Sequence, residues 1–346
     1  MNTNYIKNFN HSEFSLLFER FLQAAKTNTP IWHGTVFIGP KPLYLESNIQ
    51  WISDKIEQYF VHTIPNAHID NIKELYVLEN ISADFIPKPD SQNSYVCFLG
   101  DDIYKKPDLF INKHCIFIKN GHQCIIYMYK NDFNSLYLGE NHLLNKLFNY
   151  IFDEPDFTVL HGAVVGYNNR GVLITGLSGY GKSTLAAFCL ARNMQFVADD
   201  RVALLKKPSG LYAYPIYTTI SLGDNIPKEI KINQTYRTNS NTKDILILNK
   251  SQISENIQVT AVIEPCRDKT LPKKIIPCNH TGVITRICKD FSLLNTLTPS
   301  KNPIKDWNKI FNLLYGLDFF NINLSDSISD NANAIVNFLQ TEKQNV

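Results

Sequence analysis

The stretch that decides the fold reads Gly176-Leu177-Ser178-Gly179-Tyr180-Gly181-Lys182-Ser183 and is followed by Thr184. It fits the pattern G-x-x-x-x-G-K-[ST], in which a glycine-rich turn joins a strand to a helix and surrounds phosphate groups. The context fits as well, because Val172 to Thr175 have the apolar character of a short buried strand and apolar residues recur at helical spacing from Ser183 to about Arg192. Residues 176–184 are therefore predicted to bind a nucleotide.

Each residue type in this loop has a physical reason. Glycines let the backbone turn its N–H groups toward a phosphate chain, and the start of the following helix adds the positive end of its dipole. Lys182 supplies a mobile cation for the outer phosphates, and the Ser183 hydroxyl is a ligand for Mg²⁺. The expected ligands are ATP or GTP together with Mg²⁺, and the pattern does not distinguish the two nucleotides.

The segment before the loop predicts a hairpin. His161-Gly162-Ala163-Val164-Val165-Gly166-Tyr167 is separated from the next strand by Asn168-Asn169, and two asparagines between apolar runs favour a two-residue turn. In that register Tyr167 faces Arg170, and the ladder continues until His161 lies opposite Gly176. An antiparallel partner for the strand that enters the loop distinguishes this chain from most phosphate-loop proteins, whose strand lies in a parallel sheet.

The segment after the loop helix predicts an acidic edge. Phe196-Val197-Ala198 reads as a strand and ends in Asp199-Asp200. A right-handed crossover from the first strand through the helix puts the carboxyl ends of both strands at one edge of the sheet, next to the phosphates. One carboxylate would hold Mg²⁺ and the other would accept a proton from an attacking hydroxyl, with His161 nearby. The sequence alone leaves open which aspartate has which role.

Three motifs in this order carry a resemblance to a known family. They are His161-Gly162-Ala163, the loop 176–184, and Val197-Ala198-Asp199-Asp200-Arg201-Val202. Together they resemble the catalytic domain of bacterial HPr kinase/phosphorylase, and also its shorter relatives that phosphorylate a serine of a ribosomally made precursor peptide, as in lasso-peptide clusters. The resemblance covers about residues 110 to 220 and implies a phosphoenolpyruvate-carboxykinase-like fold, in which the phosphate loop lies in a mixed sheet.

The resemblance also implies roles for individual residues. Residues Gly176 to Ser183 would bind the phosphates, with Lys182 in a catalytic role, and Ser183 and Asp199 would bind Mg²⁺. Asp200 would be the general base, with His161 as its electrostatic or proton-relay partner. The bifunctional enzymes carry a further acidic signature that is not found between Tyr214 and Ile232, which favours a one-way kinase. Lys243 falls near a basic residue of the peptide kinases.

Composition limits the remaining choices. The chain has 346 residues, 44% of them hydrophobic, which is enough for two compact domains. A net charge of +2 gives no reason to expect a nucleic-acid partner. No signal peptide or membrane-spanning stretch is recognised, and the seven cysteines are scattered as in a reducing compartment, so a cytoplasmic protein without a membrane partner is expected. The sequence does not define an oligomeric state and leaves a homo-oligomer open.

The predicted fold class is α/β: a mixed sheet with the phosphate loop, preceded by an N-terminal α+β domain. We expect helices at Ser12–Ala25 and Ile49–Phe60, a strand at Gly34–Ile38 and a hairpin over 115–129 with the turn Asn120-Gly121. That hairpin and a helix at Leu143–Phe152 are assigned to the catalytic domain. The expected domains are 1–110, a candidate for acceptor recognition, and 111–346, the catalytic domain.

The C-terminal part gives fewer signals. A strand is expected at Val259–Ile263, and helices are expected at Ile304–Leu314 and Asn331–Leu339. The polar segment from Lys231 to Asp244 is expected to be an exposed loop.

The first functional hypothesis is an ATP- and Mg²⁺-dependent kinase that transfers the γ-phosphoryl group to a hydroxyl, most simply a serine or threonine of a peptide or protein. A kinase of a small hydroxyl metabolite is the alternative enzyme. A non-catalytic regulator that senses nucleotide is the alternative from another class, although a sensor has no need of a second carboxylate. A transporter-type ATPase fits less well, because the acidic pair follows the loop too closely.

Overall fold

The computed structural model describes residues 11–79, 81, 95–97, 109–111, 115–129, 147–149, 151–177, 179–223, 226–237, 243–267, 274–295 and 303–341. Contacts within the chain divide it into two compact units. One comprises residues 1–57, 62–151 and 295–302, and the other comprises residues 58–61, 152–294 and 303–346. Within the described part of the chain, no helix is both long and apolar enough to span a bilayer.

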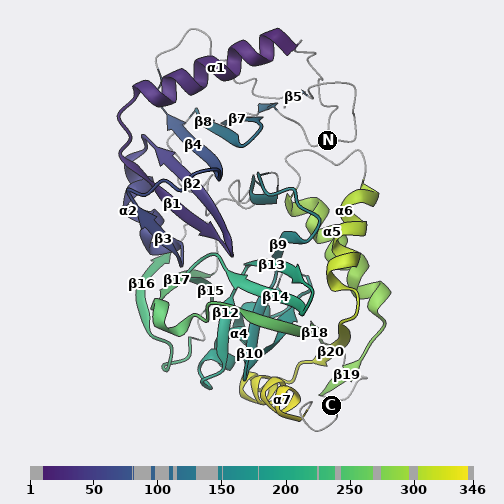
Figure 1. Cartoon of the computed structure of the whole chain (residues 1–346). Coiled ribbons are helices and arrows are strands. Elements are labelled where there is room, and N and C mark those ends of the chain that lie inside the picture. The colour runs from purple at the N-terminus through teal and green to yellow at the C-terminus, as the bar shows by residue number, and fades with distance from the viewer. Residues whose placement is uncertain are drawn as a thin grey trace. The chain divides into compact units, whose positions relative to one another are not determined.

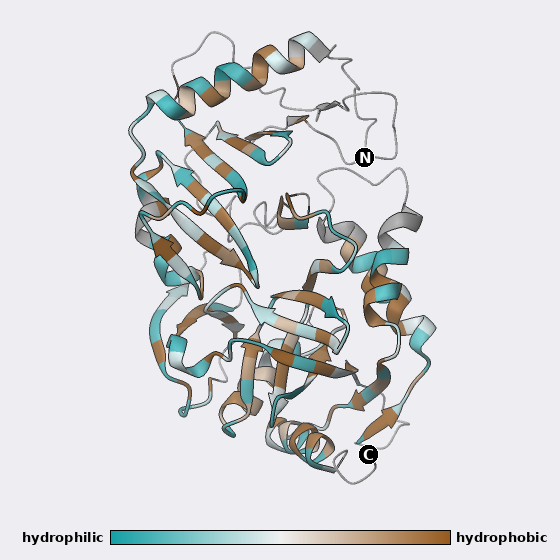
Figure 2. Cartoon of the chain, in the orientation of Figure 1, coloured by the Kyte–Doolittle hydropathy of each residue, from teal (hydrophilic) through white to brown (hydrophobic). Residues whose placement is uncertain are grey.

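The first unit is built on a mixed sheet. Its described strands run in the order β3-β1-β2-β4-β8-β7-β6-β5 (Figure 1). Their bounds are β1 Trp32–Ile38, β2 Lys41–Ser47, β3 Thr63–Pro65, β4 Lys73–Glu79, β5 Tyr95–Cys97, β6 Leu109–Ile111, β7 Cys115–Asn120 and β8 Gln123–Met128. Helix α1 (His11–Thr27) has apolar and polar residues alternating along its length (Figure 2), and its apolar face packs with residues of β4, β7 and β8. Helix α2 spans Gln50–Tyr59.

Most of the elements expected in this unit are present, but the domain boundary differs. Helices α1 and α2, strand β1 and the hairpin β7–β8 lie where the sequence predicts them. The hairpin pairs through β8 with β4, in parallel from Glu74↔Gln123 to Glu79↔Met128, and therefore completes the first sheet. The division near residue 110 was wrong for this reason, since the chain passes into the second unit after Ile151. Residues 147–149 are helical as expected, whereas 143–146 lie outside the described residues.

The second unit contains the glycine-rich loop in a mixed sheet. Its described strands follow the order β12-β10-β11-β18-β14-β13-β9, and β20 joins β18 to β19 (Figure 1). The strands are β9 Phe157–His161, β10 Ala163–Tyr167, β11 Arg170–Ile174, β12 Gln195–Ala198, β13 Arg201–Lys207, β14 Gly210–Pro215, β18 Ile257–Cys266, β19 Ile275–Pro277 and β20 Asp318–Asn323. β10 is antiparallel to both β11 and β12, while β11 and β18 are parallel. The predicted mixed sheet is therefore confirmed.

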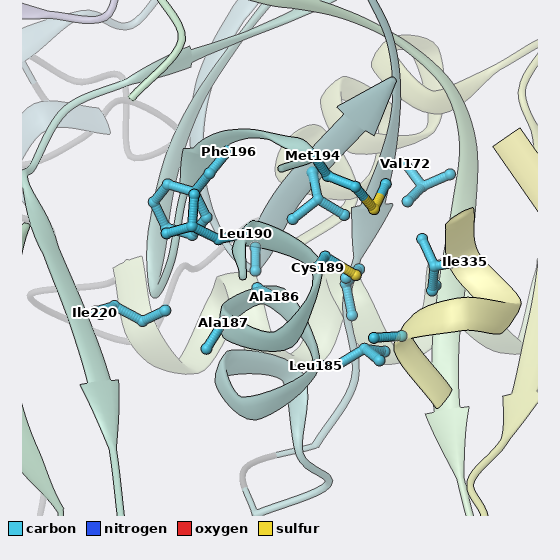
Figure 3. Packing of buried hydrophobic residues seen from close by; sticks show 14 of the residues in the cluster. Val172, Leu185, Ala186, Ala187, Cys189, Leu190, Met194, Phe196, Ile220 and Ile335 are labelled. Carbon is cyan, nitrogen blue, oxygen red and sulfur yellow. The ribbon is translucent and has the colours of Figure 1, made fainter. Parts of the chain in front are cut away.

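Helices cover both faces of this sheet. Helices α4 (Lys182–Leu190) and α7 (Ile328–Thr341) bury their apolar residues on the face of Val165 and Val172 (Figure 3). Helices α5 (His280–Asn295) and α6 (Pro303–Leu314) cover the face of Val164 and Leu173. Because successive residues of a strand point to opposite faces, continuous apolar runs such as Val164-Val165 and Val172-Leu173 suit a sheet buried on both sides. Helices α6 and α7 were predicted, and α5 was not.

The hairpin before the loop has the predicted turn but a shorter ladder. Asn168 and Asn169 both have positive φ, and Tyr167↔Arg170 closes the turn, as expected. The ladder ends at Ala163↔Ile174, so the expected pairing of His161 with Gly176 was wrong. His161 is the last residue of β9, a separate strand that pairs with β13, where it faces Arg201.

A small third sheet corrects a second expectation. It consists of β15 (Thr219–Leu222), β17 (Asp244–Leu248) and β16 (Ile232–Arg237), and a short 3-10 helix, η2 (Lys250–Gln252), follows it. The segment from Lys231 to Asp244 was expected to be a loop, yet β16 occupies much of it. Residues 233–235 of this edge strand are exposed, so neither face needs an apolar residue and the strand leaves no alternation in the sequence. Residues 238–242 lie outside the described part.

Gly166 provides a test of this packing. A Cβ atom there would lie 2.5 Å from the carbonyl oxygen of Arg170 and 2.1 Å from Cδ1 of Ile257, both far inside normal contact. We expect Gly166→Ala to lower the free energy of unfolding by about 1–3 kcal/mol, measured by urea unfolding. Gly282→Ala in α5 is the control, because its Cβ would meet only Arg286 at an ordinary 3.6 Å. Equal stability of the two variants would contradict the proposed close approach.

Candidate active site

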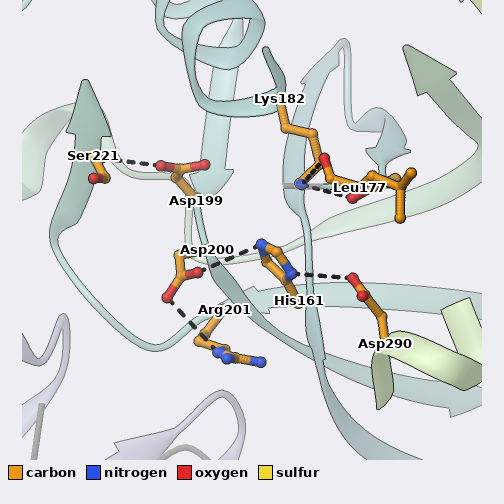
Figure 4. A network of polar contacts seen from close by, with 9 residues as sticks. His161, Leu177, Lys182, Asp199, Asp200, Arg201, Ser221 and Asp290 are labelled. Carbon is orange, nitrogen blue, oxygen red and sulfur yellow. Dashed lines mark hydrogen bonds and ion pairs between the residues drawn. The ribbon is translucent and has the colours of Figure 1, made fainter. Parts of the chain in front are cut away.

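The loop of residues 176–181 leaves β11 and ends where α4 begins. Gly181 caps α4 with φ 85°, and Gly176 has φ 130°, so both positions favour glycine. Lys182, the first residue of α4, is 6% exposed, and its ammonium donates to the carbonyl oxygens of Gly176 at 2.7 Å and Leu177 at 3.1 Å. The lysine therefore lies against the loop that precedes it (Figure 4). Ser178 lies outside the described residues.

Asp199 is buried at the end of β12. It is 3% exposed, accepts a hydrogen bond from the backbone N–H of Ser221 at 3.1 Å and another from the Ser183 hydroxyl. Burial raises the pKa of Asp199 to about 6, and the charge of Asp200 adds to this effect, while the hydrogen bonds from Ser221, Ser183 and the backbone N–H of Asp200 oppose it. The contact with Ser183 brings together the two residues that the sequence predicts as metal ligands.

Asp200 differs from its neighbour in exposure and in partners. Its side chain is 41% exposed and its φ is 65°, in the left-handed region, which few residues other than glycine, asparagine and aspartate adopt. Its Oδ1 lies 3.6 Å from Nε2 of His161, and its Oδ2 lies 3.7 Å from Nε of Arg201 (Figure 4). The Arg201 side chain is buried and forms an ion pair with Asp200. Asp200 can reach solvent, which Asp199 cannot.

His161 has a second carboxylate beside it. Its Nδ1 lies 3.3 Å from Oδ2 of Asp290, a residue of α5. The imidazole thus stands between Asp200 and Asp290 (Figure 4). Asp290 escaped the sequence analysis because it follows the loop by about a hundred residues and lies in no motif, in a helix that was not predicted.

A further ion pair lies beside the start of the loop. Glu264, at the carboxyl end of β18, is 8% exposed and accepts hydrogen bonds from Nε of Arg286 at 2.6 Å and from Nη2 of the same residue. A Cβ atom on Gly176 would lie 3.2 Å from Cγ of Glu264. The guanidinium of Arg286 therefore neutralises a carboxylate next to the place where phosphates are expected.

Several charged side chains affect the pKa of Lys182. Burial lowers the pKa of Lys182, whereas the negative charges of Asp290, Asp199 and Asp200 raise it, and the positive charge of Lys243 lowers it. These groups are therefore within electrostatic reach of the loop lysine. Lys243, the basic residue singled out in the sequence, is exposed and precedes β17.

The residues present fit a Mg²⁺ ion. The Ser183 hydroxyl and the Asp199 carboxylate are adjacent hard oxygen ligands, and burial raises the pKa of Asp199, so a cation bound here would stabilise its ionised form. Among the described residues, no group of three or more His, Cys, Asp or Glu side chains could hold a metal. A two-ligand site suits Mg²⁺, which keeps several waters and binds phosphate oxygens of the nucleotide.

The structure thus brings together most of the residues that were predicted to form a site. The loop, Lys182, Ser183, Asp199, Asp200 and His161 meet at the edge where β11 and β12 end. Thr184 follows in the first turn of α4, and the exposed side chains of Leu177 and Tyr180 lie on the loop. Asp290, Glu264, Arg286 and the backbone of Ser221 were not predicted, because each comes from a strand or helix that tertiary folding places here.

Comparison with known proteins connects this site to a family. Residues 155–215 match the HPr Serine kinase C-terminal domain. The chain is 40% identical over 78 residues to an HPr kinase/phosphorylase of Clostridium acetobutylicum, which covers 22% of this chain and 25% of the relative. It is 33% identical over 97 residues to one of Alkaliphilus metalliredigens, covering 26% and 31%. The segment of residues 155–215 is therefore similar to this kinase domain, and the matching relatives are named as enzymes.

The extent of the match is limited. The chain spans between a quarter and a third of the length of these two relatives. A solved structure of the Hpr(Ser) kinase/phosphatase from Coxiella burnetii is 16% identical, with a TM-score of 0.32, and the comparison covers 54% of this chain and 99% of the other. The family match includes His161, the loop and both aspartates, and it ends before Ser221, Glu264, Arg286 and Asp290.

The buried carboxylate of Asp199 predicts a pH-dependent stability. Its pKa is about 6 in the folded protein and about 3.9 in an unfolded chain, so folding disfavours the ionised form by about 3 kcal/mol. At low pH Asp199 is neutral in both states and the free energy of unfolding is not reduced. As the pH rises from about 4 to about 6, the carboxylate of the unfolded chain ionises first, and the folded state loses stability. We expect Asp199→Asn to unfold at a higher temperature than the unchanged protein above about pH 6, in calorimetry with a chelator present.

The control for this prediction is Asp318→Asn, which removes an exposed carboxylate at the amino end of β20. It should show no comparable gain. The gain from Asp199→Asn should shrink toward pH 4, and a gain that stays constant with pH would contradict the assignment.

Proposed function

We propose that this chain is an ATP- and Mg²⁺-dependent kinase that transfers the γ-phosphoryl group to a hydroxyl, in the first place a serine or threonine of a peptide or protein. The observation that carries the proposal is the convergence of Lys182, the Ser183–Asp199 pair and the His161–Asp200 pair at one edge of the second unit's sheet. The match of residues 155–215 to an HPr kinase domain supports it independently.

In this proposal the loop and its lysine bind the phosphates. Backbone N–H groups at the start of α4 would face the phosphate chain, and Lys182 would leave the carbonyls of Gly176 and Leu177 for the phosphate oxygens. Ser183 and Asp199 would hold Mg²⁺, which supplies charge neutralisation at the outer phosphates. The guanidinium of Arg286 keeps Glu264 from repelling the same phosphates.

The transfer step is assigned to the exposed aspartate. Asp200 accepts the proton of the acceptor hydroxyl while the hydroxyl oxygen forms a bond to the γ-phosphorus of ATP. The bond between this phosphorus and the oxygen that bridges it to the β-phosphorus breaks, and ADP leaves. Exposure supports this assignment, because Asp200 can meet an acceptor from solution and Asp199 is enclosed beside Ser183. His161 lies 3.6 Å from Asp200 and orients or relays that proton.

The preference for a polypeptide acceptor rests on the relatives. The proteins that match this segment are named for a kinase of HPr, a polypeptide acceptor. A small hydroxyl metabolite remains the alternative acceptor. A nucleotide sensor is disfavoured because the exposed Asp200 beside His161 adds nothing to nucleotide binding.

The acceptor class is tested by labelling. The protein is incubated with γ-labelled ATP and Mg²⁺, either with extract from its host or with free serine, and the products are separated by mass. Label in a polypeptide that survives acid treatment and is released by hot alkali, as expected for a serine or threonine phosphate ester and not for phosphohistidine, supports the proposal. Label in free serine or another small molecule favours the alternative enzyme. Nucleotide binding without any labelled product favours a sensor.

Two substitutions separate binding from transfer. Lys182→Ala should weaken nucleotide binding and abolish transfer, because it removes the cation that meets the outer phosphates. Asp200→Asn should keep nucleotide affinity and lower kcat by roughly 10²–10⁴-fold, the range expected for a lost general base. Calorimetric titration with ATP and Mg²⁺ gives the affinity, and the labelling assay gives kcat.

Asp318→Asn again serves as the matched control and should retain both activities. Full activity of Asp200→Asn would show that this carboxylate is not the base, and undiminished ATP affinity of Lys182→Ala would show that the loop does not hold the phosphates.

A further inference from the structure

The second carboxylate beside His161 has no role in the function proposed so far. Asp290 lies on α5, which covers the sheet face opposite α4, and outside the segment that matches the kinase domain. Its Oδ2 is 3.3 Å from Nδ1 of His161, while Nε2 of the same ring is 3.6 Å from Asp200. Both ring nitrogens therefore face carboxylates.

The hydrogen-bond chemistry of these groups fixes the orientation of the ring. An ionised carboxylate only accepts, so a hydrogen bond between His161 and Asp290 places an imidazole proton on Nδ1, whereas the 3.6 Å separation of Nε2 from Asp200 is longer than a hydrogen bond. In a neutral ring the lone pair then lies on Nε2, which faces Asp200. Without a partner at Nδ1 the ring could adopt the other tautomer or turn over.

Core packing of α5 fixes the position of Asp290. Its neighbours Ile287 and Phe291 are 5% and 4% exposed and pack in the core beneath the sheet, so α5 holds the carboxylate at a fixed place. The side chain of Asp290 is 29% exposed, compared with 18% for His161. Among the neighbouring carboxylates, Asp290 raises the pKa of Lys182 most.

We infer that Asp290 is a positioning residue for the proposed phosphoryl transfer: it holds His161 with its proton on Nδ1 and aims Nε2 at Asp200. When Asp200 takes the proton of the acceptor hydroxyl, Nε2 can accept a hydrogen bond from the resulting carboxyl group. This arrangement follows the logic of catalytic triads, in which a buried carboxylate fixes the tautomer of a histidine. The inference rests on the proposed kinase function.

The first measurement is independent of catalysis. In ¹⁵N-labelled protein, NMR spectra that correlate ring nitrogens with ring protons distinguish the two tautomers of a histidine. The signal of His161 is identified by its loss in His161→Gln. We expect the Nδ1–H tautomer in the unchanged protein and its loss or mixture in Asp290→Asn, whose amide can donate as well as accept. An Nε2–H tautomer in the unchanged protein would overturn the inference, and so would a ring protonated at both nitrogens, because its Nε2 could not accept a hydrogen bond.

The second measurement separates positioning from structural support. Asp290→Asn should lower kcat about tenfold or more, equivalent to about 1.4 kcal/mol, without weakening nucleotide affinity. A loss of affinity is not expected, because the substitution removes a negative charge near the phosphates. An unchanged kcat would overturn the inference, and so would a parallel loss of kcat and nucleotide affinity.

Two control variants and one outcome complete the test. Lys289→Ala changes the exposed neighbour on α5, and Asp318→Asn removes the same charge at the amino end of β20; both should leave the His161 spectrum and kcat unchanged. If the unchanged protein transfers no phosphoryl group to any acceptor, the proposed function fails, and the NMR result then decides by itself whether Asp290 positions His161.

Discussion

The site depends on the place of β10 between β11 and β12. Because β10 is antiparallel to both neighbours, β11 and β12 run parallel and end at the same edge, one in the glycine-rich loop and the other in Asp199. The side chains of β10 are buried on both faces, with Val164 against α5 and α6 and Val165 against α4 and α7. A slip of one residue would exchange these faces, so core packing fixes the register that aligns the site.

Burial shifts the pKa values of the two principal charged groups of the site, Lys182 and Asp199. Lys182 is 6% exposed and Asp199 is 3% exposed, and burial shifts their pKa values in opposite directions, each toward the neutral form. The protein without ligands therefore carries charged groups that are incompletely solvated. Phosphate oxygens near Lys182 and a divalent cation near Asp199 would compensate both, which is how a folded chain prepares a site for a metal–nucleotide complex.

Two adjacent aspartates obtain different environments from one backbone feature. The positive φ of Asp200 turns its side chain away from the direction taken by Asp199. Asp199 meets Ser183 and Ser221, while Asp200 meets His161 and Arg201. A strained conformation at a site of chemistry is maintained only where surrounding contacts hold it, and here β9 and β13 supply the partners on either side.

The sequence by itself determined the local elements: the loop 176–184, the strands on either side, the Asn168-Asn169 turn and the acidic end of β12. These elements follow from backbone preferences and from apolar periodicity, and both are properties of residues that are close together in the sequence. Tertiary structure alone decided that β7 and β8 complete the first sheet, that β9 carries His161 to a place opposite Arg201, and that α5 brings Asp290 to the imidazole. Such pairings join residues far apart in the chain and depend on packing, which leaves no local pattern in the sequence.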